Sequence, residues 1–139
     1  MVLKVSTDQQ ILDTREVMRQ LRPGVPFDEY PAIVARMSQT DGYRLAALYD
    51  ENVVRAVAGY RIMEMLHCGK IMYIDDLNTD ERYRSKGYGK ALMDWLKTEA
   101  RAQGCLELHL DSGVQRESTH RFYFRERFTI NCYHFHMRL

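Results

Sequence analysis

Three successive β-rich runs in the middle of the chain constrain its fold more than any other feature. The runs cover Tyr43–Tyr49, Val53–Leu66 and Ile71–Leu77. The first break, Asp50–Asn52, contains the Asp and Asn residues that hairpin turns favour, and the second, His67–Lys70, is also short. Strands that follow one another through short turns pair in antiparallel fashion, so this region predicts a β-meander.

Two helical stretches precede the meander, after a short strand over Val2–Val5. Apolar residues recur at near-helical spacing over Asp8–Leu21, and Pro23-Gly24 stops the run. The same three- and four-residue steps occur over Phe27–Met37, where Pro31 suits only the first turn of a helix. We therefore expect one helix over 8–21 and a second over 27–37.

A helix and a further strand follow the meander. The helix presents apolar residues along one face up to about Ala102, and Cys105–Leu110 alternates with period two. A crossover helix of this kind predicts a parallel pair between 105–110 and the last strand of the meander. A short helix over Ser118–Arg125 and a terminal strand over Phe128–Leu139 complete the pattern. The expected fold class is α/β with one mixed (α+β) sheet.

Composition limits the chain to one domain without a strong overall charge. A length of 139 residues suits one core, so we expect residues 1–139 to form a single domain. Twenty basic residues against nineteen acidic ones leave a net charge of +1, which argues against a nucleic-acid partner. No apolar window approaches membrane-spanning length and residues 1–8 lack a signal-peptide pattern, so we expect no membrane partner and a cytoplasmic localisation.

The cysteine and histidine patterns predict no metal. Cys68, Cys105 and Cys132 are far apart and in no paired CxxC spacing, which indicates neither a disulfide framework nor a zinc site. His134 and His136 share a face of the expected terminal strand, but no third ligand accompanies them.

The sharpest local motif is Arg84-x-x-Gly87-x-Gly89-Lys90, which lies between a strand and a helix that starts near Tyr88. Backbone N–H groups in the first turn of a helix lack intrahelical acceptors and carry the positive end of the helix dipole, so they form an anion cradle. Glycine lets a phosphate approach the backbone, and the basic side chains add positive charge. A tight turn with solvated basic side chains is the alternative interpretation.

Two other phosphate-binding motifs do not fit this segment. The dinucleotide-binding fingerprint needs a third glycine and an early βαβ unit, whereas two helices and a meander come first here. A P-loop needs Ser or Thr directly after its Lys, and Ala91 stands at that position.

The motif becomes specific when the preceding strand is included. The segment Tyr73-Ile74-Asp75-Asp76-Leu77-x-Thr79-x-Glu81-x-Tyr83-Arg84-x-x-Gly87-x-Gly89 resembles the acetyl-CoA-binding motif of the GNAT N-acetyltransferase superfamily. That family has a mixed sheet entered through two helices and a meander, and the resemblance covers nearly the whole chain. It implies acetyl-CoA as cosubstrate, with its acetyl and pantetheine portions along the backbone of Leu77, Asn78 and Thr79. It implies that the pyrophosphate is held by Arg84, Ser85, Lys86, Gly87, Tyr88, Gly89 and Lys90.

The resemblance extends to the C-terminal part of the chain. Phe122-Tyr123-x-x-x-x-Phe128 is similar to the family's Phe-Tyr-x-x-x-Gly-Phe segment, whose tyrosine is the general acid for the departing coenzyme thiolate. Tyr123 is therefore expected to be catalytic; the alternative is a hydroxyl that only caps a buried aromatic. Arg127 replaces the family's glycine, and Arg116 replaces an asparagine that contacts the cofactor. Arg116 is expected to reach a phosphate or a pantetheine carbonyl, or else to be a solvated loop residue.

Two aspartates follow the apolar part of the third strand of the meander. Strict alternation places the side chains of Asp75 and Asp76 on opposite faces of the sheet. The resemblance favours Asp76 as the group that receives the amine proton, directly or through water, or that attracts an ammonium substrate. An aspartate satisfied by nearby backbone N–H groups is the alternative. A backbone N–H near Leu77 is expected to stabilise the oxyanion.

Together, these residues predict an acetyl-CoA-dependent N-acetyltransferase that works by direct attack of a primary amine, without a covalent intermediate or a metal. An acyl-CoA-binding sensor or catalytically degenerate relative, and a nucleotide-phosphate-binding module, are the alternative hypotheses. The acceptor amine is not predicted, because loops and cleft shape set it. The resemblance also allows a homodimer formed through Phe128–Leu139.

Overall fold

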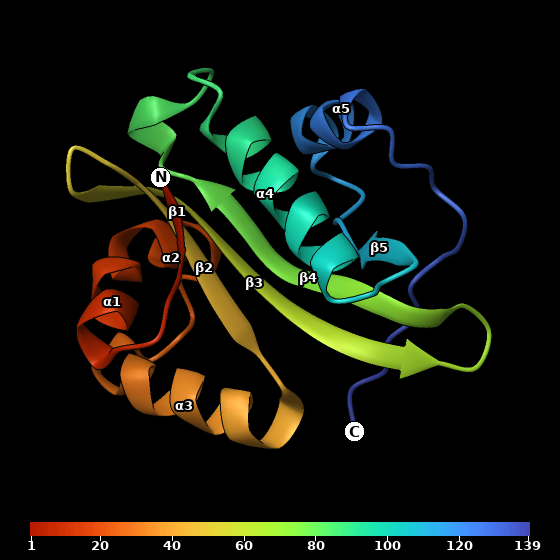
Figure 1. The fold of residues 1–139 in the computed structure, drawn as a ribbon, viewed down its shortest axis with the longest axis horizontal. Helices are drawn as coiled ribbons and strands as arrows, with labels where there is room; N and C mark the ends of the chain where they lie inside the picture. The colour runs from red at the N-terminus through yellow and green to blue at the C-terminus, as the bar shows by residue number, and fades with distance from the viewer. The chain divides into compact units, whose positions relative to one another are not determined.

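A five-stranded sheet organises the computed structural model, which describes residues 1–139. Its strands are β1 (Val2–Lys4), β2 (Arg44–Asp50), β3 (Val53–Met65), β4 (Gly69–Thr79) and β5 (Glu107–Leu110). They lie in the order β1-β2-β3-β4-β5, and each of the first three pairs antiparallel with the next (Figure 1). The predicted meander is therefore confirmed, and the fold is of the mixed α/β class.

Turn chemistry explains why β2 and β3 pair where they do. Glu51 and Asn52 have positive φ angles, 50° and 61°, at the turn between these strands. Asn tolerates the left-handed region better than most residues, and two such residues in succession form the tight turn whose twist matches a hairpin. The turn thereby sets the register, in which Asp50 lies opposite Val53.

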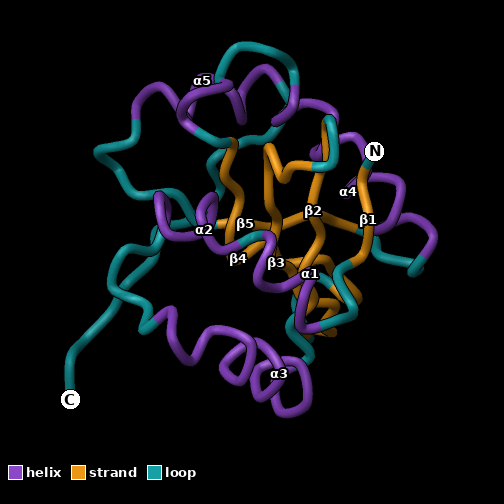
Figure 2. The backbone as a smooth tube through the Cα atoms, turned by 90° about the vertical axis from the view of Figure 1, so that its left-hand side faces the viewer, coloured by secondary structure: helices purple, strands orange, loops and turns teal.

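Helices cover both faces of this sheet. The helical segments before β2 are α1 (Asp8–Asp13), α2 (Arg15–Leu21), the 3-10 turn η1 (Phe27–Glu29) and α3 (Tyr30–Asp41). They bury an apolar cluster against alternate residues of β2 and β3, among them Leu45, Ala47 and Val57. On the other face, α4 (Tyr88–Ala102) buries Leu92, Met93 and Leu96, and its Trp95 ring lies 6.2 Å from that of Tyr60. Figure 2 shows the strands gathered together, with the helical segments α1, α2, α3 and α4 of the same unit around them.

The single helix expected over residues 8–21 is wrong, because it is interrupted at Thr14. This fully buried residue donates its hydroxyl to the carbonyl of Ile11 at 2.7 Å and lies 2.9 Å from the Tyr30 hydroxyl. A threonine that bonds the preceding turn competes with the regular helical pattern. The result is two short helices, α1 and α2, whose junction is tied to α3.

The chain divides into two units, Met1–His109 and Leu110–Leu139. The second unit contains α5 (Glu117–Arg125), where a short helix was expected over 118–125. The terminal strand expected over 128–139 is wrong, because no strand occurs there. The only backbone–backbone hydrogen bond of this segment runs from Phe128 N to Tyr123 O. Alternation of apolar residues does not make a strand without a neighbour that completes the ladder. The single domain over 1–139 stays a prediction.

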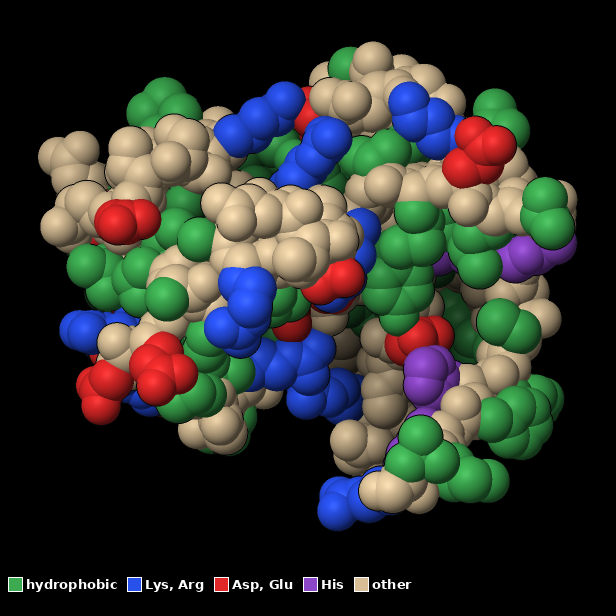
Figure 3. All heavy atoms as spheres, turned by 90° about the horizontal axis from the view of Figure 1, so that it is seen from below, with side chains coloured by type: hydrophobic (Ala, Val, Ile, Leu, Met, Phe, Trp, Pro, Cys, Tyr) green, Lys and Arg blue, Asp and Glu red, His purple; other side chains and the backbone are tan.

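Surface charge is mixed on the face shown in Figure 3, where Lys and Arg side chains lie among Asp and Glu side chains. This distribution agrees with the net charge of +1. No helix of the structure has the length and apolar character needed to cross a membrane.

Candidate functional site

The end of β4 leads into a turn that a buried carboxylate organises. Asp80 is only 1% exposed, and its side chain accepts hydrogen bonds from the backbone N, Nε and Nη2 of Arg82 at 2.7–3.1 Å. It thereby caps the 3-10 turn η2 (Glu81–Tyr83), and Gln20 of α2 donates to it as well. The hydrogen bonds from Arg82 lower the pKa of Asp80 to about 2. An ionised Asp80 therefore fixes the path of the chain toward α4.

The predicted cradle lies at the N-terminus of α4. Ser85 and Gly87 have left-handed φ angles of 64° and 82°, and Gly87 is the N-cap residue of the helix. No side chain caps the first turn of α4, and a Cβ built on Gly87 would have no atom within 4 Å. Uncapped N–H groups that face open space are free to bind an anion. Arg84, Ser85, Lys86 and Lys90 are exposed around this point, whereas Tyr88 and Gly89 are half-buried.

Cations gather around the ring of Tyr83, directly before the cradle. The guanidinium carbon of Arg55, in β3, lies 3.9 Å from the ring centroid. Lys86 Nζ lies 5.3 Å from the same centroid, and the guanidinium carbon of Arg82 lies 5.7 Å from it. Of these three cations, sequence analysis singled out only Lys86, because nothing in the spacing of Arg55 links it to the motif.

Leu77, Asn78 and Thr79 lie at the end of β4, opposite Ala58, Val57 and Ala56 of β3. The strand β5 follows Leu106, whose N–H bonds to the carbonyl of Lys70, and it is four residues long. Four residues span about 13 Å, which is too short to reach from Lys70 to Leu77. Within the first unit, no strand therefore pairs with the backbone groups on the outer edge of β4 at 77–79. The side-chain amide of Asn78, by contrast, donates to Val17 O at 2.9 Å and anchors α2.

A bulge in β4 determines where the two aspartates lie. Gly59 lies opposite Asp76 and Tyr60 lies opposite Ile74, so no residue of β3 lies opposite Asp75 in the ladder. The strict alternation that was expected to separate the two carboxylates is therefore interrupted at this point. Each carboxylate forms an ion pair with an arginine. Arg61 Nη2 lies 2.8 Å from Asp75 Oδ2, and Arg22 Nε lies 2.8 Å from Asp76 Oδ1.

Tyr43 completes the surroundings of Asp76. Its hydroxyl donates to Asp76 Oδ2 at 2.8 Å, and burial followed by the Asp76 charge raises the pKa of Tyr43 well above its usual value. The phenol therefore stays protonated and remains a donor. Gly59 makes this contact sterically feasible, because a Cβ there would overlap the Tyr43 hydroxyl and come within 2.6 Å of Asp76 Oδ2. Burial also raises the pKa of Asp75, against the opposing effect of Arg61.

Sequence analysis missed Arg22, Tyr43, Arg61 and Gly59 in this group. They come from three separate places in the chain, since Gly59 and Arg61 both lie in β3, and no spacing rule links them to Asp76. The β4 motif gave the only available signal, which was the carboxylate itself.

The two remaining predicted residues belong to the second unit. Tyr123 lies on α5, half-buried, with its ring centroid 5.6 Å from that of Phe122 and 5.7 Å from that of Phe128. Arg116 is exposed and is the N-cap residue of α5. Arg127, at the family's glycine position, has a left-handed φ of 70°. Glycine adopts this conformation without the steric penalty that arginine meets.

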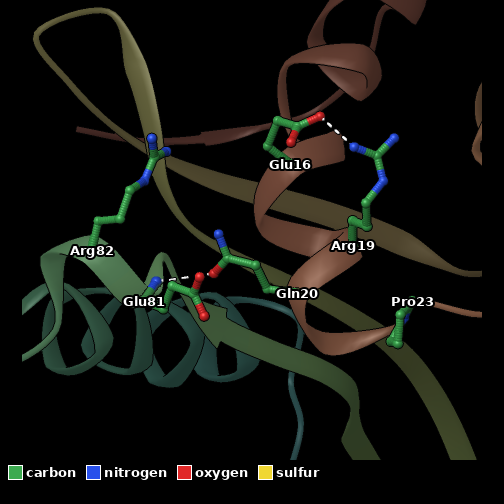
Figure 4. Close-up of a pocket in the computed structure, with 6 residues that line it drawn as sticks. All are labelled: Glu16, Arg19, Gln20, Pro23, Glu81 and Arg82. Atoms are coloured by element: carbon green, nitrogen blue, oxygen red, sulfur yellow. Dashed lines mark hydrogen bonds and ion pairs between the residues drawn. The ribbon is translucent and has the colours of Figure 1, made fainter.

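A pocket of about 570 Å³ lies between α2 and η2 in the first unit (Figure 4). It is lined by Glu16, Arg19, Gln20, Pro23, Glu81 and Arg82. None of the residues singled out from the sequence for catalysis or cofactor binding lines it. Gln20 links α2 to η2 beside this pocket, since it accepts from the backbone N of Glu81 at 2.9 Å and donates to Asp80 at 3.3 Å.

One cluster of metal-ligand types occurs near the β3–β4 hairpin. Side-chain atoms of Cys68, Glu107 and His109 lie within 4.8 Å of one another, and His109 Nε2 is 3.1 Å from Glu107 Oε1. The expectation that no metal binds stays a prediction.

Comparison with known proteins identifies relatives over most of the chain. The family model described as the acetyltransferase (GNAT) family matches residues 11–128. The chain is similar to an uncharacterized N-acetyltransferase of Bacillus subtilis (strain 168), YhdJ, with 34% identity over 95% of this chain and 94% of that protein. It is also similar to the aminoalkylphosphonate N-acetyltransferase of Salmonella typhimurium, with 30% identity over 67% of this chain and 60% of that protein.

A solved structure supports the same fold. The aminoglycoside N-acetyltransferase AAC(6')-Iy, solved in complex with CoA, superposes with a TM-score of 0.87 over 100% of this chain and 93% of that one. The two sequences are 17% identical, so this likeness concerns the fold alone.

Proposed function

The chain belongs to the acetyltransferase (GNAT) family, and on that premise we propose that it transfers an acetyl group from acetyl-CoA to a primary amine by direct attack. The observation that carries this proposal is the uncapped first turn of α4, which faces open space at Gly87. Arg84, Ser85, Lys86, Gly87, Tyr88, Gly89 and Lys90 would hold the pyrophosphate there. Arg116 would contact a phosphate or a pantetheine carbonyl.

The edge of β4 would hold the rest of the coenzyme. Leu77 and Thr79 have backbone groups on the edge that β5 does not cover, and amide groups of pantetheine can pair with such an edge as a short strand does. Asn78, between them, lies opposite Val57 with its backbone directed at β3, and its side chain bonds to α2, so it would hold this edge in place for the coenzyme.

Direct transfer requires three contributions from the protein. As the neutral amine attacks the thioester carbonyl, a backbone N–H near Leu77 would stabilise the developing oxyanion. Asp76 would receive the proton that the nitrogen loses, directly or through water. When the carbon–sulfur bond breaks, Tyr123 would donate its proton to the departing thiolate. Since Arg22 and Tyr43 already occupy both oxygens of Asp76, transfer through water is the route that the local geometry favours.

The amine acceptor is to be identified with a panel of candidate amines. Relatives are named for aminoalkylphosphonate and aminoglycoside acceptors, so these two classes head the panel to be tested. A homodimer through Phe128–Leu139 also belongs to this proposal, as does the absence of a metal requirement. Cytoplasmic localisation stays a prediction from the sequence.

An acyl-CoA-binding sensor without turnover is the second candidate. The observation that favours it is the engagement of Asp76 by Arg22 and Tyr43, which leaves no carboxylate oxygen without a partner. Both candidates need the cradle, and only turnover separates them.

Calorimetric titration with acetyl-CoA, CoA and ATP tests the cradle. Gly87→Trp should abolish binding of acetyl-CoA, because its side chain fills the space that a phosphate needs. Gly42→Trp is the matched control, since Gly42 also has a left-handed φ (67°) and no atom within 4 Å of its Cβ position. Thiol release over the amine panel then measures turnover. If the native protein bound no acetyl-CoA, both candidates would fail; binding without turnover on any amine would favour the sensor.

A further inference from the structure

We propose that Arg55 is a phosphate-binding residue, whose buried guanidinium pairs with a phosphate group of the coenzyme beside the α4 cradle. This inference rests on the proposed function, which supplies the ligand, but it concerns a residue that lies outside the GNAT motif. It follows from the burial, the partners and the location of Arg55.

Arg55 is buried without the oppositely charged partner that the other buried charged residues have. Three charged residues of the chain are buried, namely Arg55, Asp80 and Glu99. Asp80 pairs with Arg82 at 2.7 Å, and Glu99 pairs with Lys4 at 2.8 Å. Arg55 is 8% exposed, has no carboxylate within 4 Å, and its buried Nε has no hydrogen-bond partner. An unpaired buried charge is costly, so such a group indicates a partner that binds from outside the chain.

The location of Arg55 indicates the chemistry of that partner. Its guanidinium stacks on the ring of Tyr83, and Lys86 of the cradle contacts the same ring. Of the three cations at this ring, Arg82 is neutralised by Asp80, whereas Arg55 and Lys86 have no carboxylate partner. The excess positive charge therefore adjoins the loop proposed to hold a pyrophosphate. A guanidinium is planar and presents its N–H groups as a rigid fork, which suits bidentate contact with phosphate.

Coenzyme A offers two kinds of phosphate to such a group, the pyrophosphate and the ribose 3'-phosphate. Both are phosphate oxygens, and a coenzyme that lacks the 3'-phosphate distinguishes them. The structural alternative is that Arg55 only supports the Tyr83 ring and meets no ligand.

The test compares Arg55→Met with Arg55→Lys and with Arg36→Met. Methionine retains much of the apolar stem but removes the charge, and Arg36 is an exposed arginine of α3 that serves as the charge-matched control. Each variant is titrated with acetyl-CoA and with 3'-dephospho-acetyl-CoA, and the Tm of each free protein is measured. Arg55→Met should weaken acetyl-CoA binding by about 10- to 100-fold, the range expected for losing a hydrogen bond to a charged group. Its Tm should be equal or higher, because it removes an uncompensated buried charge.

Opposite effects on affinity and stability separate a binding role from a supporting one. Loss of affinity for both coenzymes would assign Arg55 to the pyrophosphate, and loss confined to acetyl-CoA would assign it to the 3'-phosphate. The proposal is overturned if Arg55→Met binds both coenzymes like the native protein, or if it lowers the Tm and Arg55→Lys restores Tm and affinity together.

Failure of the proposed function is recognised separately. If the native protein binds neither coenzyme, titration with inorganic pyrophosphate tests Arg55 alone. Weaker binding to Arg55→Met than to Arg36→Met would support the phosphate role, and equal binding would overturn it.

Discussion

At the residue scale, Asp80 sets the turn between β4 and the cradle, and its charge makes that turn sensitive to pH. Hydrogen bonds from Arg82 lower its pKa to about 2, whereas an aspartate of the unfolded chain titrates near 3.9. A carboxyl group with a lowered pKa in the folded state stabilises the protein above the unfolded pKa. That contribution is lost as pH falls from about 4 to about 2.

Asp80→Asn should therefore lower the free energy of unfolding by about 2 kcal/mol near neutral pH. The difference from the native protein should shrink as pH falls below about 4 and vanish below about pH 2, where both proteins carry a neutral group. Urea unfolding over this pH range measures it. A difference that stayed constant with pH would show that packing, and not charge, accounts for the effect.

A substitution at Gly59 tests whether Asp76 takes part in catalysis. In Gly59→Ala, the new methyl group would overlap the Tyr43 hydroxyl and crowd Asp76 Oδ2, so the carboxylate must move. If Asp76 receives the amine proton, thiol release should slow by roughly 10- to 100-fold, while acetyl-CoA binding is retained. Gly24→Ala is the control, since no atom lies within 4 Å of its Cβ position. Unchanged turnover in a folded Gly59→Ala variant would remove Asp76 from the mechanism.

At the element scale, the end of α5 contains a strained residue. Arg127 follows the C-cap Glu126 with a φ of 70°, and a side chain in this region costs about 1 kcal/mol. Arg127→Gly should therefore raise the free energy of unfolding by up to about 1 kcal/mol, as glycine enters this region freely. Glu126→Gly at φ −81° should lower it. Chemical unfolding of both variants measures these changes in the free energy of unfolding. If Arg127→Gly destabilised the protein, Arg127 would not be strained.

Local signals account for the elements that the sequence predicts well. The helix expected to start near Tyr88 and to reach Ala102 spans Tyr88–Ala102, because a glycine loop and an apolar face mark it without help from the rest of the chain. Thr14 interrupts the first helix through a contact with Tyr30, sixteen residues later, which no local pattern contains. The bulge at Asp75 likewise depends on how β3 and β4 pair.

At the scale of the whole molecule, the candidate site is assembled by the fold more than by the motif. The motif supplies Asp76 and the cradle. Arg22, directly after α2, Tyr43, directly before β2, and Arg61, in β3, contact the two aspartates from outside the motif. Arg55 is a comparable case at the cradle. Sequence reasoning finds residues that a motif lists, and tertiary structure adds those that only three-dimensional proximity selects.

The C-terminal segment exposes a row of apolar side chains that the single chain does not bury. Tyr133, Phe135, Met137 and Leu139 alternate along it and are almost fully exposed, and no strand pairs with them. Burying such side chains contributes roughly 1.5–3 kcal/mol each, and a row of unpaired backbone groups favours pairing with another chain. We therefore predict that two copies associate through Phe128–Leu139.

Light scattering coupled to size-exclusion chromatography should give about twice the 16.4 kDa mass of one chain. Phe135→Asp combined with Met137→Asp should shift the protein toward the monomer mass, since a buried apolar contact cannot accommodate two unpaired carboxylates. Asn131→Asp combined with His136→Asp adds the same charges at other exposed positions of the segment and should shift it less. If the native protein eluted as a monomer at all concentrations, the exposed apolar row would need another partner; equal dissociation by both pairs of substitutions would mean that charge alone, and not the apolar face, governs association.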